Sequence, residues 1–236
     1  MISTGILSIL GLGFVLGLKH ATDADHLIAV STIVSERKGF WTSSVVGALW
    51  GFGHTVSLLV VGLLVVAFHF EIPDKVALAM EFCVALMLVA LGANVLLKLW
   101  KGATLHLHVH EHESHQHAHL HFHEPGKEET HNHARPVGKK PFYVGMVHGM
   151  AGSAALMLLV LATIPSRIVG VLYISVFGIG SVGGMMIMSA LIGIPFSITS
   201  KHRRLTRTIQ FASGFLSVCF GIFYAWKVGF SDGLFL

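Results

Sequence analysis

Long apolar stretches alternate with short polar segments along this chain. A helix needs about 20 mostly apolar residues to cross the hydrocarbon core of a bilayer. Six stretches are long enough, near residues 5–34, 42–70, 76–99, 141–164, 168–198 and 208–230. Backbone groups in lipid must be hydrogen-bonded within their own segment, so we predict helices rather than strands. The pattern therefore predicts an all-α membrane protein with about six transmembrane helices.

The composition agrees with this class of protein. Of the 236 residues, 53% are hydrophobic and 12% are charged, whereas soluble domains carry about a quarter charged residues. The N-terminus has no basic segment, and its apolar run is too long for a cleavable signal. Cys83 and Cys219 lie in apolar stretches and indicate neither a disulfide framework nor a metal site. We expect a lipid bilayer as partner and no nucleic acid, because the basic residues lie in loops between spans.

The basic residues are distributed unevenly between the two sides of the predicted bundle. If both termini lie on one side, that side holds three of them: Lys75, Arg167 and Lys227. The opposite loops hold twelve, and Lys19 lies inside the first span. Lysine and arginine accumulate in cytoplasmic loops. We therefore predict a multi-pass protein of a bacterial-type cytoplasmic membrane, with both termini outside.

The two halves of the chain match each other in a constant register. The matching segments are Phe14-x-x-Gly17-x-x-His20 with Phe142-x-x-Gly145-x-x-His148, Gly51-Phe52-Gly53-His54 with Gly178-Ile179-Gly180-Ser181, and Glu81-Phe82 with Gln210-Phe211. We predict two three-helix repeats, residues 1–100 and 141–236. An odd number of spans makes the second copy inverted, an arrangement typical of secondary transporters. The alternative is chance similarity between glycine-rich apolar segments.

Residues 101–140 join the two halves and differ from the rest of the chain. They contain eleven histidines: His106, His108, His110, His112, His115, His117, His119, His121, His123, His131 and His133. Such a composition favours disorder and metal binding. The alternating spacing would also fit a strand, but histidine, glutamate and glutamine offer no face to bury. We predict a histidine-rich, disordered cytoplasmic loop.

Two histidines and two aspartates lie in the middle of the first apolar stretch, in the segment His20-Ala21-Thr22-Asp23-Ala24-Asp25-His26. Ionisable groups are costly inside a membrane and by default indicate a functional site. Imidazole suits nickel, copper, zinc and iron, and a carboxylate adds a hard anionic ligand. The segment therefore predicts an intramembrane site for a divalent transition metal ion.

The segment leaves two arrangements open. On a regular helix, His20, Asp23 and His26 share one face and would be ligands, with Asp25 orienting an imidazole from behind. If the helix breaks near residues 21–24, all four side chains converge on one cavity. The alternative to metal binding is a buried charge network, including Lys19, that only holds helices together.

Two histidines in later spans are further candidate ligands. His54 follows Gly51-Phe52-Gly53, whose glycines allow another helix to approach closely. His148 is the counterpart of His20 in the second half, and the small residues after it are typical of tight helix packing. A hydrogen-bonded helix contact is the alternative for His54. Because Ser153 stands opposite Asp25 in the repeat, we expect an asymmetric site.

These motifs resemble those of the nickel/cobalt transporter family. The segment from His20 to His26 resembles its His-x4-Asp-His signature, and Gly53-His54-Thr55-Val56 resembles its second motif. The stretch after His148 resembles short, urease-accessory-type nickel permeases. The resemblance implies a secondary permease with His20, Asp25, His26 and His54 in the metal path. The better-studied members have eight spans and an acidic Asp-Thr-Ala-Thr-Glu stretch, neither of which we find.

We therefore predict uptake of Ni²⁺, or of Co²⁺, as the transported substrate, with no prosthetic group. The predicted metal-binding residues are His20, Asp23, Asp25, His26, His54 and His148. Urease or hydrogenase metal-insertion machinery is the expected partner. The alternatives are an efflux permease and a membrane metal sensor or chaperone that does not transport. An enzyme is not expected, because a His-Glu-x-x-His pair and a nucleophile motif are both missing from the sequence.

Overall fold

The computed structural model describes residues 4–37, 39–68, 72–101, 105–112, 115–122, 137–151, 166–199 and 202–236. Its helices are α1 (Thr4–His20), α2 (Ala24–Val34), α3 (Phe40–Phe68), α4 (Asp74–Trp100), α5 (Lys140–Gly149), α7 (Arg167–Ile198) and α8 (Arg203–Trp226), which continues into the π-helix η2 (Lys227–Ser231). Two strands, β1 (Leu105–His112) and β2 (His115–Phe122), pair antiparallel.

Four helices in the described part are long and apolar enough to cross a membrane, namely Phe40–Leu64, Asp74–Trp100, Arg167–Ile198 and Arg203–Ser231. A fifth span results if α1 and α2, which meet at a 54° bend, are counted together. Four of the six predicted stretches therefore match candidate spans, and the first stretch matches a fifth if its bent pair of helices is counted as one span. The fourth begins as α5, but residues 152–165 lie outside the described residues. Six helices thus stay a prediction.

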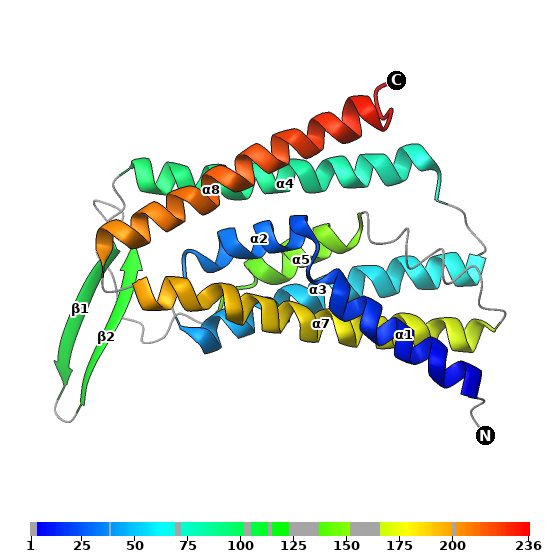
Figure 1. The fold of residues 1–236 in the computed structure, drawn as a ribbon, viewed down its shortest axis with the longest axis horizontal. Coiled ribbons are helices and arrows are strands. Elements are labelled where there is room, and N and C mark those ends of the chain that lie inside the picture. The colour runs from blue at the N-terminus through cyan, green and yellow to red at the C-terminus, as the bar shows by residue number, and fades with distance from the viewer. Residues whose placement is uncertain are drawn as a thin grey trace.

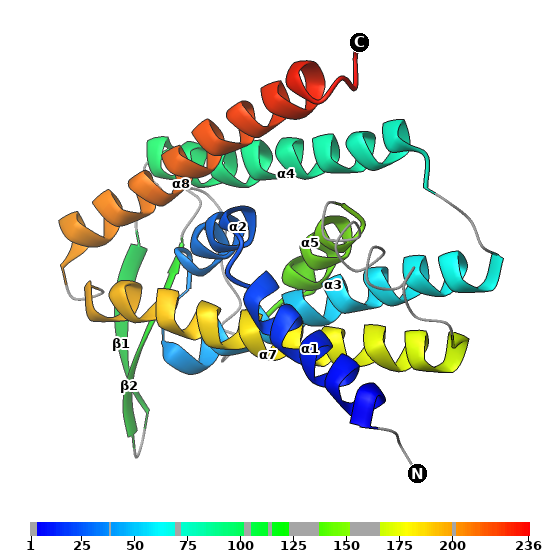
Figure 2. The same cartoon turned by 45° about the vertical axis from the view of Figure 1, so that its right-hand side comes forward.

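The helices form two packed groups (Figures 1 and 2). The helices α4 and α8 lie side by side, while α3 packs against α7 and α5, and α1 packs against α7. The short helix α2 lies between the groups and contacts α7, α8 and α4. The colours in Figure 1 show that α3 and α7 run in opposite directions, as do α4 and α8. The beginnings of α1, α4 and α7 lie toward one end of the molecule, and the hairpin lies at the other.

The loop between the halves contains regular structure that the sequence analysis did not predict. The register of the hairpin places His106 opposite His121 and His108 opposite His119. Histidine at every second position matches the two-residue period of a strand. The structure thus describes a hairpin within the predicted loop. That the loop is disordered stays a prediction, and residues 123–136 lie outside the described residues.

Close contacts between helices occur in matched pairs. In each contact, a Cβ built on a glycine would collide with the backbone oxygen of a residue on another helix. The three pairs are Gly17–Phe177 with Gly145–Trp50, then Gly180–Phe14 with Gly53–Phe142, and finally Gly221–Ala85 with Gly92–Gly214. The members of each pair are separated by 127 to 129 residues, the offset found between the matching sequence segments. Each of these contacts thus has a counterpart made by the other half of the chain.

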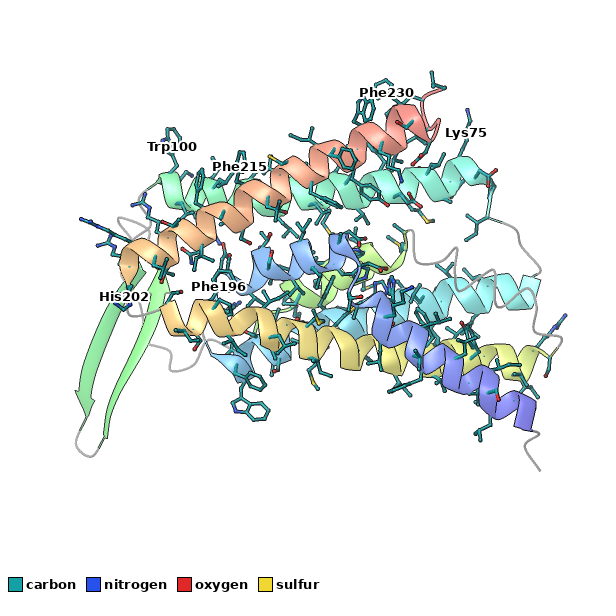
Figure 3. All side chains as sticks on the ribbon, in the orientation of Figure 1. Lys75, Trp100, Phe196, His202, Phe215 and Phe230 are labelled. Atoms are coloured by element: carbon teal, nitrogen blue, oxygen red, sulfur yellow. The ribbon has the colours of Figure 1, made fainter. Side chains whose placement is uncertain are left out.

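The outer surface is strongly apolar. Trp100 is 83% exposed, and Phe215 and Phe230 are more than half exposed. Figure 3 shows these three side chains pointing away from the bundle. A continuous apolar surface of this kind indicates contact with lipid rather than with water.

Candidate metal site

The first span is broken at the centre of the predicted site. Helix α1 ends at His20, and α2 begins at Ala24 with Asp23 in an extended conformation at its N-cap position. The Thr22 hydroxyl donates to the carbonyl of Lys19 at 2.6 Å. Aspartate is favoured at an N-cap, and acidic residues are favoured in the first turn of a helix. The predicted break is therefore present, with a bend of 54°. The Asp23 carboxylate makes no capping bond and accepts from His20 Nδ1 instead, so the expected convergence of all four side chains does not extend to Asp23.

The break brings four buried imidazoles together from four helices. His20 ends α1, His26 lies on α2, His54 on α3 and His148 on α5, and none is more than 8% exposed. The ring centre of His26 lies 4.3 Å from that of His20, 5.1 Å from that of His54 and 4.1 Å from that of His148. Residues up to 128 positions apart in the chain thus share one small volume.

Two of these imidazoles are spaced as ligands of one metal ion would be. His20 Nε2 and His54 Nε2 lie 3.1 Å apart. Imidazole nitrogens bind zinc at about 2.1 Å, so two such ligands at right angles lie about 3.0 Å apart. Nickel(II) accepts square-planar and related geometries with neighbouring ligands at right angles. Small movements of these rings would therefore place both nitrogens on one ion.

Two carboxylates determine which ring nitrogens carry protons. Asp25 Oδ1 accepts from His26 Nδ1 at 3.1 Å, and its Oδ2 accepts from His148 Nε2 at 2.9 Å. Asp23 Oδ2 accepts from His20 Nδ1 at 2.7 Å. An ionised carboxylate can only accept, so these three nitrogens are the donors. The other nitrogen of each neutral ring then holds a lone pair, the form in which imidazole binds a metal.

Four buried nitrogens have no hydrogen-bond partner among the described residues: His26 Nε2, His54 Nδ1, His148 Nδ1 and the indole Nε1 of Trp50. Buried polar atoms are nearly always paired, so exceptions require an explanation. Of these, His26 Nε2 and His148 Nδ1 hold lone pairs when Asp25 accepts from the opposite nitrogens of their rings, so both can bind a cation.

Helix ends add to the attraction for a cation. Helix α1 ends at His20 and α5 ends at Gly149, next to His148. The C-terminus of a helix carries about half a negative charge and favours cations. Both helices therefore direct their negative ends toward the imidazoles, while Asp25 supplies a full negative charge.

Among the predicted residues, five come together in two overlapping groups. The donor atoms of His20, His26 and His54 lie within 4.8 Å of one another, and so do those of Asp25, His26 and His148. Asp23 belongs to neither group; its side chain is 49% exposed and lies behind His20. The geometry thus places Asp23 as an orienting partner of an imidazole, and Asp25 among the potential ligands. That any of these residues binds metal stays a prediction.

A family model described as high-affinity nickel-transport protein, NicO, matches residues 6–212. The chain belongs to the NicO family. The match covers the broken first span, α3, α5 and α7, and with them every imidazole of the cluster. A NicO protein is a nickel transporter rather than an enzyme, and the apolar helices make this member a multi-pass membrane protein. The predicted resemblance is therefore confirmed.

Individual relatives of this NicO protein cover most of its length. It is 40% identical to "Urease accessory protein UreH" of Bacillus sp. (strain TB-90), over 98% of this chain and 96% of the relative. It is 26% and 27% identical to the chloroplast proteins FOR GROWTH AND FERTILITY 2 and 1 of Arabidopsis thaliana, over 94% and 89% of this chain. It spans just over half of those two proteins, 57% and 56%. No solved structure matches the chain.

Two aromatic residues of this NicO protein complete the site, and the sequence analysis missed them. The Trp50 ring centre lies 5.2 Å from that of His26 and 5.5 Å from that of His148. The Phe177 ring centre lies 5.7 Å from that of His20. Trp50 precedes His54 by one helical turn and therefore shares its face, a spacing that could have identified it. Phe177 gives no such signal, because it comes from α7.

Proposed function

We propose that this NicO protein carries Ni²⁺ across the cytoplasmic membrane through the cluster of His20, His26 and His54, with Asp25 and His148 beside it. The observation that supports this most directly is the convergence of four buried imidazoles, three of which have an unpartnered nitrogen. A structural role alone would not favour leaving basic nitrogens unpaired in a protein interior. Membership of a nickel-transport family is the reason for proposing nickel as the transported ion.

The imidazole and carboxylate groups of the site are suitable ligands for a divalent cation that must lose its bound water. Imidazole is a ligand for nickel, and a carboxylate lowers the cost of placing two positive charges in a medium of low polarity. Asp25 and the negative ends of α1 and α5 provide that compensation. Cobalt(II) accepts the same donors and differs mainly in affinity, so we propose Co²⁺ as a second substrate.

The surrounding helices support a mechanism of alternating access. We propose that residues 1–100 and 141–236 form two inverted three-helix repeats. The paired glycine contacts and the opposite directions of α3 and α7 favour this arrangement. In such transporters the substrate site lies at the repeat interface near the midplane, where rocking of the halves exposes it to either side.

Uptake is the direction that we propose. Two positive charges gain about 4.6 kcal/mol per 100 mV of inside-negative potential, taking about 2.3 per charge. The tally of basic residues favours a cytoplasmic histidine-rich loop, which would receive the metal after passage. The relative named urease accessory protein suggests urease metal insertion as the destination, with hydrogenase insertion as a related one. Efflux would use the same site with the loop collecting metal before passage.

Radioactive nickel uptake into sealed proteoliposomes with an imposed potential tests this function. We would compare the wild type, His20→Ala, Asp25→Asn and a variant lacking residues 104–133. His202→Ala is a matched control, because His202 is exposed at the start of α8 and lies outside the cluster. We expect loss of flux in the first two variants, and retained flux in the deletion and the control.

One outcome would favour a different class of protein. If the wild type shows no nickel flux in either direction of potential or proton gradient, and the loop still binds metal, the proposal of a permease is wrong. A membrane sensor or metallochaperone would then be the better description. It requires the loop and does not require His20.

A further inference from the structure

Two sets of potential ligands lie on opposite sides of one imidazole. His20, His26 and His54 form what we call the inner set, and Asp25, His26 and His148 form the outer set. His26 belongs to both. Its Nδ1 faces Asp25 Oδ1 at 3.1 Å, whereas its Nε2 has no partner among the described residues.

The shape of imidazole separates the two sets. The lone pairs of Nδ1 and Nε2 point away from each other across the ring, so one ring cannot bind a single ion through both. Because Nδ1 of His26 is the nitrogen beside Asp25, Nε2 is the nitrogen left for the pair His20–His54. The two sets therefore describe two positions for an ion, one on each edge of this ring.

The two positions differ in exposure and in charge. Every member of the inner set is buried, with His26 and His54 at 1% and 0% exposure. The outer set contains the Asp25 carboxylate, whose side chain is 25% exposed. An ion arriving from water thus meets first the set that carries a negative charge, and next a set of neutral imidazoles with no exposed member.

We propose that a single Ni²⁺ occupies the outer and inner sets in turn, with His26 as the ligand common to both. This inference rests on the proposed function and adds the order in which the ligands act. Two ions bound at once through both nitrogens of His26 would require that ring to lose its remaining proton, and the two dications would also repel each other. His26 serves the two positions through opposite nitrogens, so its bond at Nδ1 breaks and the ring proton returns to Nδ1 before Nε2 binds the ion at the inner position.

The exchange needs no net gain or loss of protons. The outer position requires lone pairs on His26 Nδ1 and His148 Nε2, which now donate to Asp25. Their protons move to the opposite nitrogens of the same rings, which are the ones without a partner. Passage to the inner position returns the His26 proton to Nδ1 and to its bond with Asp25. Each imidazole carries one proton throughout.

Nickel binding to the variant lacking residues 104–133 tests the two positions, since the histidine-rich loop no longer contributes. In this background, His54→Ala removes the inner set and His148→Ala removes the outer set. We expect each to retain one bound Ni²⁺ with an affinity within about tenfold of the parent, while the double variant loses at least 100-fold. We expect both single variants to lose transport. His54→Gln and His148→Gln serve as second variants of similar volume if the alanine forms are misfolded.

X-ray absorption spectroscopy then counts the imidazoles on the bound ion. We expect two in His54→Ala, from His26 and His148, and three in His148→Ala, from the inner set. If either single variant already loses binding as completely as the double variant, the ion has one position and the relay is wrong. Absence of binding in the parent itself, with flux missing as well, would instead overturn the proposed function.

Discussion

Replacing Gly145 with alanine tests whether the close approach of α5 to α3 positions His148. A Cβ on Gly145 would collide with the Trp50 backbone oxygen and lie 2.9 Å from the Cδ1 of its ring. The backbone oxygen cannot rotate away, so the two helices must separate by about 1 Å, an overpacking that costs about 1–3 kcal/mol. For a chain of this size, each kcal/mol lowers Tm by about 2–4 °C, so we expect a fall of about 2–12 °C in detergent.

Gly183→Ala is the matched control for this substitution. Gly183 also lies within an apolar helix, α7, but a Cβ built there has no neighbour within 4 Å. Alanine favours helix over glycine by up to about 1 kcal/mol, so Tm should stay unchanged or rise slightly. Nickel flux should fall in Gly145→Ala, because His148 moves away from Asp25, and it should be retained in Gly183→Ala. Equal thermal stability of the two variants would refute the reasoning.

Two further predictions concern the polar contacts at the hairpin end of the bundle. The buried Gln210 side chain donates to the carbonyl of Ser35 at 2.7 Å, so Gln210→Ala should lower the free energy of unfolding by about 1–3 kcal/mol. Thermal unfolding should show little change for the exposed control Thr208→Ala. Equal losses of stability in the two variants would contradict this prediction. Desolvation lowers the pKa of Lys140 and the charge of Glu36 raises it. Glu36→Gln should therefore lower that pKa further and speed acylation of the amine at pH 9, measured by mass spectrometry of labelled peptides; an unchanged rate would exclude this coupling.

The spans could be predicted because they depend on composition alone. The predicted stretch 168–198 agrees with α7, Arg167–Ile198, and 42–70 agrees with α3, Phe40–Phe68. Hydropathy records how apolar a segment is, and lipid makes such a segment helical whatever its neighbours are. The histidine-rich loop has no such constraint, and its composition did not predict the hairpin that the structure describes there.

The break in the first span also had a signal in the sequence. Thr22 and Asp23 are helix-starting residues in the middle of an apolar run, which would have favoured the broken arrangement over the regular one. The sequence held no signal for the hydrogen-bond partners of Asp25. Its contact with His148 joins residues 123 positions apart, and only the packing of α5 against α3 brings them together. For the same reason the place of Asp23 behind His20, away from the candidate ligands, could not be read from spacing.

The paired helix contacts have a consequence for the polarity of the protein. Every glycine contact of one half that has a counterpart in the other is made again by a helix running the opposite way, as with Gly17 and Gly145. A frame built in this manner looks alike from both faces of the membrane, and by itself it distinguishes no forward from reverse. The acidic residues Asp23 and Asp25 have no such counterpart, since Ala151 and Ser153 stand at the equivalent positions. If the halves are the inverted repeats that we propose, sidedness arises from what differs between them: these two carboxylates, the uneven distribution of lysine and arginine, and the histidine-rich loop.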